Sequence, residues 1–429
     1  MPEAHAKSAL LSALSFSPDF SGLAKLPALG RDDGNALLQW LDRSGLSLYL
    51  LRQLQNFDRI SQLPAPWSSA LDERFRSNVE RTHDMLDEFE RLHQAFRARG
   101  VKAIGLKGLT LTPDFCEHLP LRHQADIDFL VAPPDVPKAA IVLSALGYAA
   151  KNLNAAGETC FTTAMDRIPS TADYLYALQH QRQVDLHTDV WEENPWLEMD
   201  VPRDCIRYAT RRSVRDIEFW SLSLEDSFLF QVLHVFRHSL RSWIRLSWLR
   251  ELGRCIELHR EDPELWGRIT RRAGESALIK KVFAFVLGLV DRIFKAPLPG
   301  EIGEWIAGTD TMVLDTWLDQ IGVDWAMTDW PGSLTNLFVM SEFIPHAQVR
   351  SRYWRSRLIP RKENASIGVN LPKNGTALIK LEVARAKYLA QRASAHLMEI
   401  CELPAVGIRW KRALAAARQA PFKPTLEGG

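Results

Sequence analysis

The sequence predicts an α+β fold, with a small mixed β-sheet between a helical N-terminal part and a mainly helical C-terminal half. Three observations predict it. Apolar residues recur at helical spacing in the first hundred residues, short apolar runs of strand length follow, and helical spacing returns from Ser223 onward. At 429 residues the chain exceeds what one core usually covers. We therefore expect three regions, covering residues 1–99, 100–222 and 223–429.

The N-terminal part contains two expected helices. Residues 34–56 carry apolar side chains at helical spacing. Residues 70–98 form a longer candidate helix, in which apolar side chains recur at intervals of roughly three or four. Gly100 follows and is typical of a C-terminal helix stop. This part is therefore expected to be helical up to the start of the sheet.

The middle region consists of short β-like runs with turn signals between them. A helix is expected within it over residues 135–146, with Asp135 as its N-terminal cap and Gly147 as its stop. The expected strands are 101–106, 125–131, 158–164, 173–178, 182–190 and 214–220.

From Ser223 onward the pattern is almost entirely helical. Ser223, with Asp226 three residues later, fits a capping box at the start of the first of these helices. Residues 361–375 are polar and contain Pro and Gly, so we interpret them as a loop, and the tail after residue 419 as frayed. The expected helices are 223–240, 244–260, 276–295, 311–320, 334–345 and 376–399.

Composition restricts the class of protein. With 46% hydrophobic and 24% charged residues, the chain is ordinary for a globular protein. A formal net charge of +1 excludes a uniformly basic nucleic-acid-binding surface, although it leaves room for a local basic patch. The five cysteines are scattered and never form a CxxC pair, which argues against a disulfide framework and a cysteine zinc site. We interpret them as reduced, mostly buried thiols of a cytoplasmic protein.

No segment predicts an association with a membrane. The first twenty residues lack the charged start and long apolar centre of a signal peptide. The most apolar run, Val282–Val290, is about half as long as a bilayer-spanning helix. We therefore expect a buried helix at this position.

Two aspartates interrupt the strand expected over residues 125–131. Asp126 and Asp128 are two residues apart, so their side chains point to the same face. Like charges this close repel each other unless a cation lies between them. Asp185, in the strand expected over 182–190, offers a third carboxylate. Three carboxylates on neighbouring strands suit Mg²⁺, which prefers oxygen ligands and in pairs clamps the attacking and leaving oxygens of a phosphoryl transfer.

The order of these motifs resembles the uncharacterised nucleotidyltransferase family of bacteria, a branch of the polymerase-β-like nucleotidyltransferase superfamily. The resemblance is carried by Leu106-Lys107-Gly108, Arg122, the segment from Asp126 to Val131 and the segment from Val184 to His187. It implies a nucleotidyltransferase core over residues 100–222. It also implies a Mg²⁺-dependent enzyme that moves an NMP from an NTP, such as ATP, to an acceptor hydroxyl or phosphate and releases pyrophosphate. The acceptor would be a small molecule, a peptide or RNA.

The resemblance also implies roles for the site residues. Asp126, Asp128 and Asp185 would be the catalytic and metal-binding carboxylates, with Asp185 helping to deprotonate the acceptor. Gly108 would belong to the turn that holds the triphosphate. A lysine precedes this glycine, where the superfamily usually has Gly-Ser, and the distance in sequence from Gly108 to Asp126 is longer than usual. The phosphate-binding turn therefore departs from the family pattern more than the metal site does.

Three further residues complete the expected nucleotide site, each with an alternative. Lys107 and Arg122 would supply the positive charge that the missing serine does not. Lys107 could instead be a structural partner of Asp126, and Arg122 could form a salt bridge behind the site. His187 could orient a phosphate or a metal-bound water, or could simply form a hydrogen bond with Asp185.

Two other candidate ligand sets are weaker. Asp189 shares the strand face of Asp185, but the family pattern favours Asp185, and we expect Asp189 at the strand end or in a loop. His234 and His238 are four residues apart on an expected helix, a spacing that can bind zinc. The zinc-protease motif requires Glu after the first His, whereas this chain has Val235. A core or cleft-facing pair is the better interpretation.

The stretch Arg350–Lys362 contains six basic residues with Tyr353 and Trp354 among them. Such a stretch can bind an acidic partner or a nucleic acid, although a solvated helix face is its usual meaning. Two alternative functions therefore stay open. One is a non-catalytic NTP-binding or antitoxin-like regulatory protein, and the other is a nucleic-acid end-modifying enzyme with salt-sensitive binding through this stretch.

Overall fold

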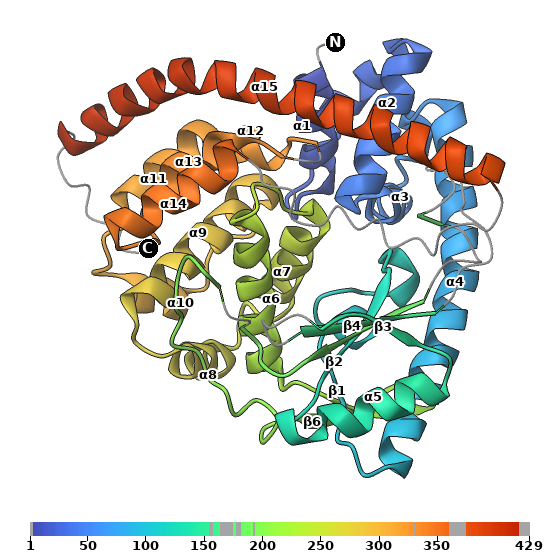
Figure 1. The fold of residues 1–429 in the computed structure, drawn as a ribbon. Coiled ribbons are helices and arrows are strands. Elements are labelled where there is room, and N and C mark those ends of the chain that lie inside the picture. The colour runs from blue at the N-terminus through green and yellow to red at the C-terminus, as the bar shows by residue number, and fades with distance from the viewer. Residues whose placement is uncertain are drawn as a thin grey trace.

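The computed structural model describes residues 3–153, 158–163, 175–176, 182–191, 194–329, 332–359 and 375–419. Figure 1 shows a β-sheet beside a larger body of helices, with the long helix α15 (Gly375–Gln419) running across the top of that body. The sheet and the helical regions on both sides of it in sequence confirm the predicted α+β class.

The sheet contains seven strands among the described residues, in the order β3-β4-β5-β2-β1-β7-β6. The pairs β2–β5 and β1–β7 are parallel, and the other neighbouring pairs are antiparallel. The strand β2, which carries two aspartates, is therefore flanked on both sides. The bounds are β1 Ile104–Gly105, β2 Asp126–Leu130, β3 Ala149–Leu153, β4 Glu158–Thr162, β5 Gln183–His187, β6 Thr210–Val214 and β7 Ile217–Ser221.

One face of the sheet packs against α4 (Ala65–Ala98) and α5 (Val136–Ala145), as Figure 1 shows. Apolar side chains of both helices and of the strands form one cluster there. The ring of Phe89 stacks on that of Phe129 with centroids 5.3 Å apart, and Phe96 meets Phe129 edge-on at the same separation. Aromatic pairs of this kind add to the stabilisation from area burial, so this face is a closed apolar core.

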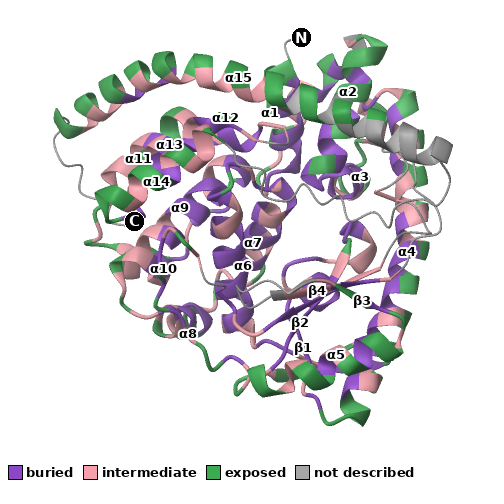
Figure 2. Ribbon diagram, viewed as in Figure 1, coloured by how far each residue is buried: buried purple, intermediate pink, exposed green. Residues whose placement is uncertain are grey.

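The helical body has one apolar core, coloured as buried in Figure 2, that includes residues of the N-terminal helices and of the C-terminal half. Helix α1 (Glu3–Leu14) contacts α9 (Ala277–Phe294), and the Phe16 N–H donates to the Phe294 carbonyl at 2.8 Å. The expected apolar helix at Val282–Val290 lies in α9 and is almost entirely buried. The boundaries proposed between the three regions stay predictions.

The other helices complete this body. They are α2 (Arg31–Ser44), α3 (Ser47–Asn56), α6 (Leu224–Ser239), α7 (Leu246–Leu258), α8 (Pro263–Ala273), α10 (Gly300–Ile306), α11 (Met312–Trp317), α12 (Val323–Ala326), α13 (Leu337–Met340) and α14 (Ala347–Leu358).

Several expected boundaries differ from those observed. The helix expected over 34–56 is divided into α2 and α3, because Gly45 adopts a left-handed conformation with φ of 74° and ends α2. The strand expected over 101–106 is reduced to the two residues of β1. The expected helix at 334–345 contains only a short 3₁₀ turn and α13, and α15 continues to Gln419 instead of ending at residue 399. Helices α1, α8, α10, α12 and α14 and strands β3 and β6 were not predicted.

The helix-end predictions were mostly correct. The Ser223 hydroxyl accepts a hydrogen bond from the Asp226 N–H at 3.2 Å, as a capping residue should. Gly100 and Gly147 follow their helices with φ of 68° and 88°. The prediction that Asp135 caps α5 is wrong. Its backbone is already helical, with φ of −91° and ψ of −11°, and its carboxylate forms an ion pair with Lys138 at 3.2 Å instead of capping an N–H.

Three expected features lie outside the described residues in large part. They are the strand over 173–178, of which only 175–176 is described, the loop over 361–375 and the tail after 419. Within the described residues, no helix combines the length and the apolarity that crossing a membrane requires. All five cysteines are free thiols, and Cys116, Cys205 and Cys255 are buried.

Candidate functional site

The candidate site lies on the face of β2 and β5 opposite the apolar core. Along β2, Asp126 and Asp128 alternate with Ile127 and Phe129, which join the cluster under α4 and α5. The parallel register places Asp128 directly beside Asp185 of β5. Strand alternation and pairing therefore bring the three predicted carboxylates to one place.

These three carboxylates form a compact oxygen cluster. One ligand atom from each of Asp126, Asp128 and Asp185 lies within 4.8 Å of the others, and no other group of three His, Cys, Asp or Glu side chains among the described residues is arranged in this way. Asp128 and Asp185 are only 2% and 4% exposed. Asp128 Oδ2 has no hydrogen-bond partner in the described part of the chain. Buried, acceptor-only oxygens of this kind suit a hard cation such as Mg²⁺.

Two nitrogen-bearing side chains balance the charge on Asp128. Lys107 Nζ lies 3.0 Å from Asp128 Oδ1 and 3.8 Å from Asp126 Oδ2, and His187 Nε2 lies 3.1 Å from the same Asp128 oxygen. Burial alone would raise the pKa of Asp128, but attraction by Lys107 and His187 lowers it to about 2. Burial would likewise lower the pKa of Lys107, but attraction by Asp128 and Asp126 raises it. Both groups are therefore ionised at neutral pH.

Asp185 is held by a neighbour that the sequence did not single out. The side-chain amide of Gln183, two residues earlier on β5, donates to both Asp185 oxygens at 2.9 and 3.2 Å. Asp189 lies beyond the end of β5, where its carboxylate accepts from the Val190 N–H at 2.7 Å and pairs with Arg203 at 3.1 Å. Asp189 therefore serves the loop and lies outside the carboxylate cluster. The position of Gln183 two residues before Asp185, on the same strand face, is the sequence signal that could have identified it.

Gly108 turns the chain directly after Lys107. Its φ of 69° is in the left-handed region, and a β-carbon there would come within 2.3 Å of Gln124 Oε1. Gln124 is 6% exposed, and this oxygen has no hydrogen-bond partner among the described residues. Arg122 Nη1 lies 3.9 Å from the same β-carbon position. A tight turn is thus bordered by polar groups beside the carboxylates.

Arg122 is fixed by a partner far away in the sequence. Its Nε donates to Glu251 Oε1 of α7 at 3.0 Å, and the Tyr49 hydroxyl donates to the same oxygen at 3.0 Å. Glu251 is 1% exposed, so the pair is deeply buried. Burial would lower the pKa of Arg122, but attraction by Glu251 raises it. The guanidinium is therefore anchored and charged, with its Nη1 on the side of Gly108.

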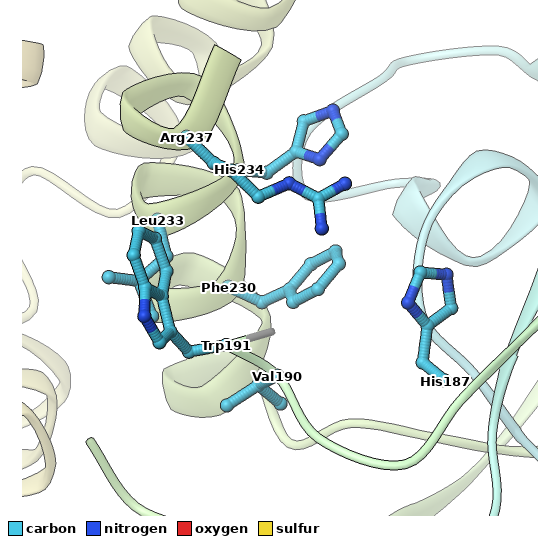
Figure 3. A pocket seen from close by; sticks show the side chains of 7 residues that line it. All are labelled: His187, Val190, Trp191, Phe230, Leu233, His234 and Arg237. Atoms are coloured by element: carbon cyan, nitrogen blue, oxygen red, sulfur yellow. The ribbon is translucent and has the colours of Figure 1, made fainter. Parts of the chain in front are cut away.

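A pocket separates the end of β5 from helix α6. Its volume is about 10 Å³, room for about one water molecule, and it is lined by His187, Val190, Trp191, Phe230, Leu233, His234 and Arg237. Figure 3 shows Phe230, His234 and Arg237 extending from α6 toward His187 on the other side. Because His187 also contacts Asp128, the pocket adjoins the carboxylate cluster.

The predicted alternatives at His234 and at the basic stretch can be compared with the structure. The rings of His234 and His238 lie 4.6 Å apart, and both contact Trp248, so they form an aromatic group on α6. Burial, and next the charge on Lys107, lower the pKa of His234 well below its usual value. Neither histidine belongs to a group of three candidate metal ligands within the described residues.

The basic stretch is only partly available on the surface. Arg350 donates to the Ile344 carbonyl at 3.2 Å, and Arg357 donates to the Arg241 carbonyl at 2.8 Å. Tyr353 is fully buried, with its hydroxyl donating to the Leu240 carbonyl. These side chains therefore hold α14 against neighbouring segments of the helical body. Arg361 and Lys362 lie outside the described residues.

Comparison with known families gives one result. A family model described as "Uncharacterised nucleotidyltransferase" matches residues 31–295, more than half of the chain and all of the candidate site. A search of curated proteins found no match, and neither did a search of solved structures.

Proposed function

The chain belongs to the uncharacterised nucleotidyltransferase family, and from this premise and the site geometry we propose that it is a Mg²⁺-dependent nucleotidyltransferase. It transfers an NMP from an NTP to an acceptor hydroxyl or phosphate. A bond forms between an acceptor oxygen and the α-phosphorus. The bond from that phosphorus to the oxygen bridging it to the β-phosphate breaks, and pyrophosphate leaves.

One observation carries the proposal. Three carboxylates from two parallel strands converge within 4.8 Å on one face of the sheet, beside a tight glycine turn. Lys107 and His187 both contact the same oxygen of Asp128, so they leave its second oxygen available. This second oxygen is buried and has no hydrogen-bond partner in the described part of the chain. This favours a site built to receive a cation.

The donor set fits the metal that the family implies. Oxygen-only ligands on rigid strands are the usual environment of Mg²⁺, and Asp126, Asp128 and Asp185 would hold it. When bound, Mg²⁺ neutralises negative charge on the α-phosphate and on the departing pyrophosphate. Lys107 contributes a fixed positive charge next to the same carboxylates.

The remaining side chains have roles that follow from their places. Asp185, held by Gln183, takes the proton of a hydroxyl acceptor. Gly108 lets backbone N–H groups approach an anion closely, which a residue with a β-carbon would prevent. Arg122, anchored by Glu251, directs positive charge toward this turn. His187 orients Asp128 from the β5 side. Fixed charges of this kind supply most of the rate in phosphoryl transfer.

The test measures nucleotide binding and turnover separately. Isothermal titration with Mg²⁺ and non-hydrolysable analogues of ATP, GTP, CTP and UTP is combined with an assay of pyrophosphate release from each NTP. Asp126→Asn with Asp128→Asn should abolish Mg²⁺-dependent NTP binding, because both changes remove ligand charge and keep the side-chain shape. Asp185→Asn should retain binding and lose turnover, because the base is gone.

Asp189→Asn is the matched control, since it removes a carboxylate from the same segment but outside the cluster. It should leave binding and turnover unchanged. Circular dichroism would verify that each variant is folded. Undiminished Mg²⁺-dependent NTP binding in a folded Asp126→Asn, Asp128→Asn protein would refute the proposal. NTP binding without any pyrophosphate release in the wild type would instead favour the non-catalytic alternative.

A further inference from the structure

We infer that a cavity between α12 and α15 is a second ligand site, and that it takes a small organic cation which also carries a hydrogen-bond acceptor. The cavity has a volume of about 430 Å³. Sites for small molecules commonly have this size. Its lining residues lie between Gln320 and Trp410, outside the residues 31–295 that match the family model. The inference therefore goes beyond the proposed function and does not depend on it.

The cavity lies where α15 crosses the helical body. Figure 1 shows α15 passing over α12, and the lining residues come from both helices and from the segment between α12 and α13. Glu399 Oε2 of α15 accepts from the Ser333 hydroxyl at 2.6 Å and from the Leu334 N–H at 3.0 Å. The rings of Trp410 and Phe338 lie 6.5 Å apart. These contacts hold the two walls of the cavity together.

The charge of the lining selects the ligand. Asp324 of α12 and Glu399 and Glu402 of α15 are acidic, whereas Arg409 is the only basic residue that lines the cavity in the described part of the chain. Three carboxylates and one guanidinium give the lining a formal charge of −2. None of the four forms an ion pair with another described residue. A cleft in which one sign of charge prevails concentrates the opposite charge, so this cavity favours a cation.

Two tryptophans form the apolar walls, and they differ in their hydrogen bonding. Trp325 and Trp410 are 3% and 7% exposed. Indole rings attract cations, which agrees with the charge of the lining. The Trp325 N–H donates to the Ser333 carbonyl at 3.3 Å, whereas the Trp410 N–H has no partner among the described residues. An indole N–H usually has a partner when its side chain is buried. Trp410 therefore offers a donor to an acceptor atom of the ligand.

The two walls define where the parts of the ligand lie. Its cationic group lies among the carboxylates of Asp324, Glu399 and Glu402, and its acceptor receives the Trp410 N–H. Since Asp324 belongs to α12 and the other three residues to α15, a bound ligand joins α15 to the helical body. Binding should therefore protect the backbone of both helices from hydrogen exchange.

The experiment titrates three aromatic probes into the full chain without nucleotide, followed by NMR signals of the probes. Phenylalaninamide is a cation with an acceptor carbonyl, phenethylamine is a cation without one, and N-acetylphenylalanine is an anion with one. At about pH 6 the amines and the carboxylates of the cavity are charged. The variants are Asp324→Asn with Glu402→Gln, and Trp410→Phe. The matched controls are Glu304→Gln, on an exposed residue of α10, and Trp354→Phe on α14, both outside the cavity.

Phenylalaninamide should bind about fivefold more tightly than phenethylamine, and N-acetylphenylalanine should not bind. The Asp324→Asn, Glu402→Gln protein should bind both cations about tenfold more weakly, whereas Glu304→Gln should stay within about twofold of the wild type. Trp410→Phe should remove the difference between the two cations, and Trp354→Phe should keep it. Binding of the anion as tight as that of the cations, cation affinity unchanged in the double variant, or a difference that persists in Trp410→Phe would overturn the inference.

Hydrogen exchange with and without phenylalaninamide locates the bound probe. Exchange should slow in α12 and in the part of α15 around residues 399–410, and should stay unchanged in β2 and β5. Slowing confined to β2 and β5 would place the probe at the carboxylate cluster and overturn the inference. Because no nucleotide is present in these samples, absence of Mg²⁺–NTP binding in a separate titration would count against the proposed function alone.

Discussion

The two faces of β2 and β5 differ although the same two strands build both. On one face Ile127, Phe129 and their β5 neighbours close against α4 and α5 in an apolar cluster. On the other face Asp126 and Asp128 lie beside Asp185, with Lys107 and His187 in contact. Alternation along a strand lets a five-residue element such as β2 support a packed core and a charged site simultaneously.

The comparison teaches that the two faces are stabilised in different ways. The stability of the apolar face depends on how completely side chains fill the space, because atoms that line a cavity lose their packing partners. The stability of the charged face depends on the balance of charge, since buried carboxylates are tolerated only next to cations or hydrogen-bond donors. Changes of shape should therefore damage the first face and changes of charge the second. Three predictions follow from that distinction.

The largest effect is expected on the apolar face. Phe129→Ala should lower the free energy of unfolding by roughly 3–5 kcal/mol, because it opens a cavity beside two aromatic rings, one stacked on Phe129 and one edge-on to it. Phe129→Leu keeps most of the volume and should cost less than about half as much. Urea denaturation followed by circular dichroism measures both. Equal losses for the two variants would mean that volume does not govern this face.

An intermediate effect is expected on the charged face, at Lys107. Lys107→Met keeps most of the length of the side chain but removes the positive charge beside Asp126 and Asp128. The free energy of unfolding, measured in EDTA, should therefore fall by about 2 kcal/mol. Added Mg²⁺ should then raise the melting temperature of the variant more than that of the wild type, since the metal replaces the lost charge.

The control for Lys107 is Lys138→Met, which removes a lysine from a surface ion pair with Asp135. It should change stability by less than about 1 kcal/mol and should not alter the response to Mg²⁺. If Lys107→Met were as harmless as the control in EDTA, the carboxylates would not need a cation in the absence of metal.

The sequence predicts which residues lie on each face of the strands better than it predicts the distant partners that hold these residues in place. Alternation alone placed Asp126 and Asp128 on one face and Ile127 and Phe129 on the other, because the period of a strand is independent of the rest of the chain. The division of the helix expected over 34–56 was not predicted, although glycine, which ends α2 at Gly45, is the residue that most often stops a helix.

Long-range partners could not be predicted. Glu251 lies 129 residues after Arg122, and no local pattern links the two. The pocket likewise requires α6 to face the end of β5, which follows from packing and not from spacing. Lys107 was expected to contact phosphate or to pair with Asp126. Its closer contact with Asp128 depends on the antiparallel register of β1 with β2.

The smallest effect compares two glycines at opposite ends of the segment that contains β1. Gly100 and Gly108 have φ of 68° and 69°, so alanine at either position should cost about 1 kcal/mol from backbone strain alone. A β-carbon at Gly100 has no neighbour within 4 Å, whereas one at Gly108 meets Gln124 Oε1 at 2.3 Å. Gly108→Ala should therefore lower the free energy of unfolding by about 1 kcal/mol more than Gly100→Ala does.

Truncation of Gln124 distinguishes contact from strain. In a Gly108→Ala, Gln124→Ala protein the contact is gone, so the additional loss relative to Gly100→Ala should disappear once the cost of Gln124→Ala alone is subtracted. Chemical denaturation of the four variants measures each term. Equal losses of stability for the two glycine substitutions would contradict this prediction. They would show that the turn at Gly108 accommodates a β-carbon as readily as the exposed turn at Gly100 does, and that Gln124 is not held in one fixed position.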